Sequence, residues 1–183
     1  MAIMPGTHKL GPENASLRVE TRRGGAAAKA GHDLLIEVGS WQGKLEIGED
    51  PGQNSLVLSA DSGSMEVIEG TGGIKALTEE DKAEIKKTLE AEVLQPGSVE
   101  FKSTRVTPSD DGRIEVTGEL SMNRNVHPLD FELELRPDGA VSARATVRQS
   151  DWGIEPYSGL FGTLKVRDEV EVVGKASLSS DRQ

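Results

Sequence analysis

Apolar and polar side chains alternate along most of this chain, and this alternation limits the folds that it can adopt. It is clearest in 129–136 (LDFELELR), where a leucine or phenylalanine precedes each charged residue. The same period of two runs through 16–22, 114–122 and 141–148. Because successive side chains on a β-strand point to opposite faces, each segment is predicted to be a strand with one buried face. In total we expect eight or nine antiparallel strands.

Two Asp-Gly pairs indicate tight turns between predicted strands. Asp111-Gly112 leads into the segment 114–122, and Asp138-Gly139 joins 129–136 to 141–148. Asp-Gly is favoured where both central residues of a two-residue hairpin loop need positive φ. We therefore predict hairpins at both pairs, with a type I′ turn at the first.

One long segment departs from the alternation and is predicted to be a helix, 78–94 (TEEDKAEIKKTLEAEVL). Thr78 is the expected N-cap, with Asp81 three residues further on, and Pro96-Gly97 ends the helix. Its apolar side chains form one narrow stripe, made of Ile85, Leu89 and Val93. Such a helix is marginal in isolation, so we expect it to lie as a cover over the β-structure.

A sheet of this kind must bury its apolar face. Closing the sheet on itself buries that face and removes the exposed edges, so we predict an all-β fold with one main helix, an antiparallel barrel of about eight strands. Several inward positions carry small residues: Gly118, Ala143, Ala145, Gly174 and Ala176. These residues either leave room for a ligand or fit a narrow end of the barrel, and the sequence favours neither alternative.

Composition excludes several classes of partner. The chain of 183 residues fits a single domain, 1–183, with a tail at 179–183 that we expect to fray. A net charge of −10 repels phosphates, which argues against nucleic acid and against docking on anionic lipid. The chain has no cysteine and no run of 18 apolar residues, so we expect neither thiol chemistry nor stable membrane insertion. Its start lacks a basic segment before an apolar run, and we predict a cytoplasmic protein.

Motifs for catalysis or metal binding are weak. Gly70 and Gly72 match only part of a dinucleotide loop, and we interpret them as a tight turn. The histidines His8, His32 and His127 lack the spacing of a metal site, and no nucleophile elbow is present. We therefore predict no catalytic and no metal-binding residues.

Several motifs, taken in order, resemble the YceI-like family. They are KAGHDL at 29–34, WQG at 41–43, VIEGTGGIKALT at 67–78, VEFKST at 99–104, GELSMN at 118–123, DWGI at 151–154 and DEV at 168–170. The resemblance covers 9–178, with Trp152 where the family has phenylalanine. It implies a lipocalin-like barrel with a helix packed near it, a long apolar cavity that holds a polyisoprenoid or another lipid-like chain, and no catalytic residues.

The inward positions of the strands, together with the loop 150–162, give the expected ligand-binding residues. They are Leu34, Ile36, Met65, Val67, Val116, Leu120, Met122, Phe131, Leu133, Ala143, Ala145, Trp152, Ile154 and Phe161. The predicted function is non-catalytic binding, transport or sequestration of an isoprenoid, quinone or fatty-acid-like lipid. We expect no other cofactor.

Two other functions are compatible with this fold. One is an enzyme that acts on a lipophilic substrate with His32 or His127 as general base. The other is a filled structural barrel that acts through its surface, for instance as a homodimer. An ionisable side chain inside an apolar cavity would favour the enzyme, and the absence of a cavity would favour the filled barrel.

Overall fold

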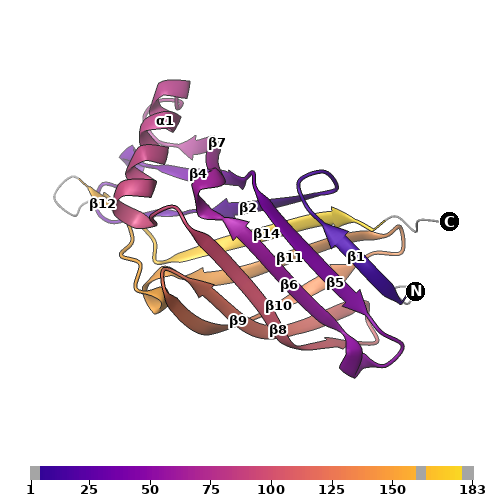
Figure 1. The fold of residues 1–183 in the computed structure, drawn as a ribbon. Coiled ribbons are helices and arrows are strands. Elements are labelled where there is room, and N and C mark those ends of the chain that lie inside the picture. The colour runs from indigo at the N-terminus through magenta and orange to yellow at the C-terminus, as the bar shows by residue number, and fades with distance from the viewer. Residues whose placement is uncertain (1–4, 160–163, 179–183) are drawn as a thin grey trace.

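Antiparallel strands dominate the computed structural model, which describes residues 5–159 and 164–178 (Figure 1). The strands are β1 (Gly6–Leu10), β2 (Ala15–Glu20), β3 (Arg23–Gly24), β4 (His32–Val38), β5 (Trp41–Ile47), β6 (Ser55–Asp61), β7 (Met65–Gly72), β8 (Ser98–Pro108), β9 (Arg113–Met122), β10 (Asn125–Leu135), β11 (Ala140–Arg148), β12 (Ser158–Gly159), β13 (Leu164–Val166) and β14 (Glu169–Ser177). The main helix is α1 (Glu79–Thr88), and the short helical turns are η1 (Ala28–Ala30), η2 (Pro51–Gln53), η3 (Ser62–Ser64), η4 (Leu89–Val93) and η5 (Gln149–Trp152).

Eleven of these strands form one antiparallel sheet, in the order β1-β5-β6-β8-β9-β10-β11-β14-β2-β4-β7. The remaining three form a small sheet in the order β12-β13-β3. The main sheet is strongly curled, and α1 lies at one end of it beside β7 (Figure 1). The predicted fold class, a mostly β protein with a single main helix and a lipocalin-like antiparallel sheet, is confirmed.

The predicted number of about eight strands was too low, because the short strands β1, β3 and β12 lie in segments that the alternation did not mark as strands. Two long strands also bend. β4 runs into β5 across Gly39 and Ser40, and β6 runs into β7 across η3. β5 pairs with β6, and β4 pairs with β7. Backbone hydrogen bonds continue the pairing through the bend, since Gly39 N donates to Ser64 O at 3.0 Å and Asp61 N donates to Ser40 O at 3.0 Å. The two halves of this bent hairpin therefore lie near opposite ends of the strand order, and the sheet curls round a central space.

The two-residue hairpin lies where the sequence gave no Asp-Gly signal. Asn123 and Arg124 have φ of 50° and 61° and connect β9 to β10, with both central residues at positive φ as in a type I′ turn. The type I′ prediction at Asp111-Gly112 was wrong, because only Gly112 has positive φ, 86°. That loop is longer and closes through Ser109 N, which donates to Arg113 O at 2.8 Å.

The helix begins and ends close to the predicted residues. Thr78 is its N-cap, and the capping box with Asp81 is complete: Thr78 Oγ1 accepts from Asp81 N at 3.1 Å, and Thr78 N donates to Asp81 Oδ2 at 2.9 Å. The last five residues, η4, widen into a π-helical turn. An ion pair between Lys86 and Glu66 joins α1 to β7.

Among the described residues, β9 carries more buried apolar side chains than any other strand, and the rest are spread over most strands of the main sheet. The most deeply buried are Ile36, Leu45, Val106, Ile114, Val116 and Trp152. In the part of the chain that the structure describes, no helix is both long and apolar enough to cross a membrane. Phe161 and the tail at 179–183 lie outside the described residues.

Candidate functional site

A cavity of about 580 Å³ lies inside the curled sheet. Most of its lining side chains are apolar and come from strands on every side of the sheet and from α1 and η4. Pockets that hold small organic ligands typically have volumes of roughly 300–1,000 Å³. The cavity therefore has the size and the surface character of a site for an apolar molecule.

Small side chains on the adjacent strands β11, β14 and β2 leave much of this space. Ala143 pairs with Gly174 across β11 and β14, and Ala176 pairs with Ala15 across β14 and β2. All four residues line the cavity. A Cβ atom built on Gly174 has only the Cβ of Ala143 within reach among the described atoms, at 4.0 Å. We call β11, β14 and β2 the hollow wall.

The strands β8 and β9 are packed in the opposite way, and we call them the packed wall. Gly118 is buried on β9, but a Cβ atom there would lie 2.5 Å from the ring of Phe101 and 2.5 Å from Lys102 O. Phe101 is only 5% exposed, and its ring centroid lies 5.2 Å from that of Phe131. Gly118 therefore makes room for an aromatic ring and leaves no void. Small inward residues thus leave space in the hollow wall, whereas in the packed wall Gly118 accommodates a ring.

The apolar stripe of the helix faces the cavity, as the sequence predicted. Ile85 from α1, and Leu89 and Val93 from η4, all line it. None of these residues is fully buried by protein atoms. The helix is therefore a cover over one end of the cavity, supported by its contacts with β7.

Most of the predicted ligand-binding residues line the cavity: Leu34, Ile36, Met65, Leu120, Met122, Phe131, Leu133, Ala143, Ala145 and Ile154. Val67, Val116 and Trp152 are buried but do not line it. Trp152 Nε1 donates to Leu120 O at 2.8 Å, which holds the indole against β9. Contact with a ligand stays a prediction at all these positions.

Sequence reasoning did not select several residues that line the cavity. Leu17 and Val19 on β2 and Val172 on β14 belong to the hollow wall and face the same space. The alternation in 16–22 had already placed Leu17 and Val19 on one face of a strand. The alternation would have identified Leu17 and Val19 as lining residues if the strand at 16–22 had been assigned to the cavity.

Two polar side chains, Arg23 and His32, line the cavity where the glycine-rich end of β7 approaches it. Gly72 and Gly73 have φ of 82° and 74°, in agreement with the predicted tight turn. A Cβ atom on Gly72 would overlap the Arg23 guanidinium, and one on Gly73 would overlap the His32 ring. His32 Nε2 lies 2.7 Å from Lys75 O, so Nε2 carries the hydrogen that it donates. The glycines therefore let both side chains pack directly against the backbone.

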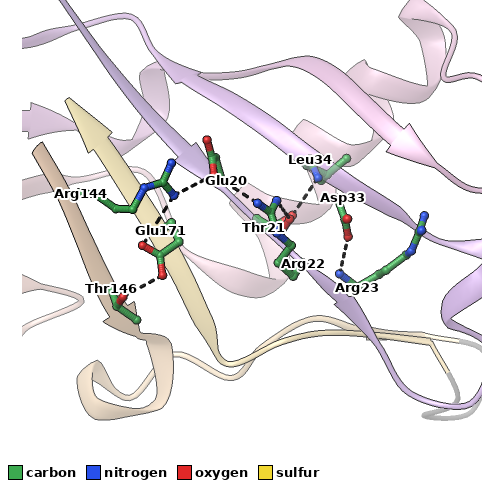
Figure 2. Close-up of polar contacts among 9 residues, drawn as sticks. All are labelled: Glu20, Thr21, Arg22, Arg23, Asp33, Leu34, Arg144, Thr146 and Glu171. Atoms are coloured by element: carbon green, nitrogen blue, oxygen red, sulfur yellow. Dashed lines mark hydrogen bonds and ion pairs between the residues drawn. The ribbon is translucent and has the colours of Figure 1, made fainter. Parts of the chain in front are cut away.

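The polar groups on the outside of the hollow wall form ion pairs (Figure 2). Arg144 Nη1 lies 3.1 Å from Glu20 Oε2 and 3.8 Å from Glu171 Oε2. Thr146 Oγ1 donates to Glu171 Oε1 at 2.7 Å. The hydrogen bond from Arg144 is the main reason why the pKa of Glu20 lies below its ordinary value, against the opposing effect of burial.

The other candidate histidine lies away from the cavity. His127 is exposed on β10, and its ring contacts Trp152 edge to face with centroids 5.5 Å apart. Within residues 5–159 and 164–178, no group of three or more His, Asp or Glu side chains is placed to hold a metal ion. Of the two histidines considered as a general base, His32 therefore lines the cavity and His127 lies outside it.

Comparison with known proteins agrees with this geometry. The family model described as the YceI-like domain matches residues 10–178. Among solved structures, BcnA of Burkholderia cenocepacia has a TM-score of 0.63 at 11% identity, over 90% of this chain and 96% of BcnA. The YceI protein of Campylobacter jejuni has a TM-score of 0.51 at 11% identity, over 79% of this chain and 85% of that protein. A search of curated protein sequences finds no match. At such low identity the two solved structures show the shared fold alone.

Proposed function

We propose, from the premise that this chain belongs to the YceI-like family, that it binds and carries or sequesters an isoprenoid or another lipid-like chain without changing it chemically. The observation that supports this function is the cavity of about 580 Å³ with its apolar lining. The helix adds a second argument, because its only apolar stripe covers that cavity. These side chains can contact a ligand in the cavity as well as pack against the protein.

Affinity would come from burial of the chain. Each methylene group removed from water contributes about 0.8 kcal/mol. About ten buried methylenes would then give about 8 kcal/mol before the costs of association, which are estimated at roughly 4–15 kcal/mol. A long chain is needed to offset such costs, which favours prenyl, quinone-tail or fatty acyl chains over short ligands. Selectivity would follow the length and girth of the chain, because the hollow wall presents few polar groups.

The two rival functions receive less support. A filled barrel has no internal space of this kind, so the cavity argues against a purely structural role. An enzyme that uses His127 as general base would need that side chain at the substrate, whereas it is exposed on β10. His32 does line the cavity, but its Nε2 is engaged by Lys75 O. The cytoplasmic location and the homodimer stay predictions, which cell fractionation and light scattering test.

Native mass spectrometry of protein purified from its own host tests the proposal, followed by organic extraction of any bound molecule. A discrete adduct that extracts as a prenyl or acyl chain is the expected result. Bare protein that also takes up no added polyprenol and no added fatty acid would contradict the proposed function.

A further inference from the structure

Arg23 is a cation at the edge of a cavity whose other lining groups are mainly apolar. Within residues 5–159 and 164–178, its guanidinium has no carboxylate partner; its Nη1 donates instead to Gly31 O at 2.9 Å and to Thr71 O at 3.3 Å. Arg23 is half-buried, so its positive charge is partly removed from water and an accompanying anion would stabilise it. The described part of the chain supplies neutral carbonyl groups to this guanidinium and no carboxylate.

Asp33 contacts the backbone of Arg23 but does not neutralise this charge. Asp33 Oδ1 accepts from the backbone N of Arg23 at 2.9 Å, and the guanidinium extends away from it (Figure 2). Arg144 on the outer face shows the contrast, because Glu20 and Glu171 both lie within ion-pair distance of it. The outer arginine is matched by acidic partners of this chain, whereas the inner one is not.

The other charged groups that line the cavity do not supply the missing anion. Glu84 is exposed, and its Oε1 accepts from Lys87 Nζ at 3.0 Å. Asp61 Oδ1 accepts from Gly63 N at 2.8 Å in the bend between β6 and β7. Lys165 and Lys175, which also line the cavity, add two further positive charges.

The guanidinium is held in place before any ligand arrives. The missing Cβ of Gly72 lets it lie against the backbone, and two carbonyl groups fix Nη1. A guanidinium carries five N–H donors in a rigid fork, and the bonds to these carbonyls use only Nη1. A planar fork of this kind matches the oxygens of a carboxylate or a phosphate.

We infer that the Arg23 end of the cavity binds the anionic group, a carboxylate or a phosphate, of an amphiphile whose apolar chain fills the cavity. This inference rests on the proposed function and adds a head-group site to it. The ligand class is then a long apolar chain with one acidic end, and an uncharged chain of equal length binds less tightly.

Matched ligand pairs test the inference on the unmodified protein. Oleate is compared with oleyl alcohol, and geranylgeranyl phosphate with geranylgeraniol, by isothermal titration calorimetry below the micelle concentration of each ligand. A charge-assisted contact predicts that the acid of each pair binds about tenfold to 100-fold more tightly than its alcohol. That advantage should shrink as salt is raised, whereas the affinity of the alcohols should not.

Variants assign the effect to the guanidinium. Arg23→Gln should remove the advantage of the acids and leave the affinity for the alcohols unchanged, and Arg23→Lys should restore part of it. Arg22→Gln is the matched control, because Arg22 is the neighbouring residue but is exposed and paired with Glu20. Retained alcohol binding shows that each variant still folds.

Each result has one meaning. Tighter binding of an acid than of its matched alcohol supports the inference. The ligand pair that shows the larger difference identifies the head group as a phosphate or a carboxylate. Equal affinity for acid and alcohol in the unmodified protein overturns the inference but leaves the proposed function in place. Loss of acid and alcohol binding to the same extent in Arg23→Gln also overturns it. Absence of binding for all four ligands overturns the proposed function itself.

Discussion

The hollow wall and the packed wall both contain an inward-facing glycine, but the two glycines have opposite effects on packing. Gly174 on β14 has open space above it, whereas Gly118 on β9 is covered by the ring of Phe101. Both are inward-facing glycines within alternating segments, and nothing in either segment alone separates them. The difference comes from the side chain on the neighbouring strand, which is Ala143 in one case and Phe101 in the other. A small residue makes a cavity only where its neighbours are small as well.

The largest effect is expected from truncation of the packed wall. Phe101→Ala should lower the free energy of unfolding by about 3–5 kcal/mol, because it removes a ring that is 5% exposed and packs over Gly118. Phe131→Ala is the matched variant, since both phenylalanines line the cavity but Phe131 is less buried. We expect Phe131→Ala to lower the free energy of unfolding by clearly less than Phe101→Ala. Urea denaturation measures both, and equal losses would mean that the two phenylalanines have similar environments.

Adding one methyl group should distinguish the two glycines. Gly118→Ala should destabilise the fold by about 1–3 kcal/mol, because the new Cβ meets an aromatic ring and a backbone oxygen that cannot both move away. Gly174→Ala should be neutral or should stabilise by up to about 1 kcal/mol, since the methyl group enters open space and the unfolded chain loses freedom. Thermal and urea unfolding give the comparison. A destabilised Gly174→Ala variant would contradict the open space in the hollow wall.

Filling the hollow wall should affect binding more than stability. Ala143→Leu adds three carbon atoms to the cavity and should displace a similar number of ligand methylenes, about 2 kcal/mol or about 30-fold in affinity. Ser142→Leu, on the outer face of the same strand, is the control and should leave affinity unchanged. Displacement of a fluorescent fatty acid from each variant provides the measurement. Unchanged affinity in Ala143→Leu would remove this position from the binding site.

The smallest effect concerns the outer face of the hollow wall. The pKa of Glu20 is lowered from its ordinary value of 4.5, chiefly by the hydrogen bond from Arg144. Its contribution to stability is therefore present above pH 4.5 and is lost as the pH falls through the lowered pKa. Arg144→Gln should raise the pKa of Glu20 and lower stability at pH 7 by about 0.5 kcal/mol, because exposed ion pairs are screened by solvent. Unfolding curves at pH 3 and pH 7 test this, and the two proteins should converge at the lower pH.

Much of the local structure could be predicted from the sequence. Alternation assigned the strand faces correctly at Leu133 and Ala143, and the cap at Thr78 fixed the start of the helix. The stripe of Ile85 and Leu89 even indicated which side of the helix faces inward. These features depend on neighbours within a few residues, whose geometry is set by the backbone of a single strand or helix.

The turns were harder to predict. The two-residue hairpin at Asn123 and Arg124 carries no glycine. The Asp111-Gly112 pair fell in a longer loop, where only the glycine needs positive φ. In each case the backbone conformation is selected by the partner strand across the turn, which local sequence does not reveal.

The sequence by itself determined that this chain forms antiparallel strands with one apolar face, a single capped helix and no thiol chemistry. Only the tertiary structure decided which small residues open a cavity, because Gly118 and Gly174 differ in the side chains that distant strands place beside them. It also decided that, among the residues that the structure describes, Arg23 has no acidic partner for its guanidinium while Arg144 has two. Packing and charge pairing depend on residues far apart in the chain, so their outcome appears only when the sheet has curled.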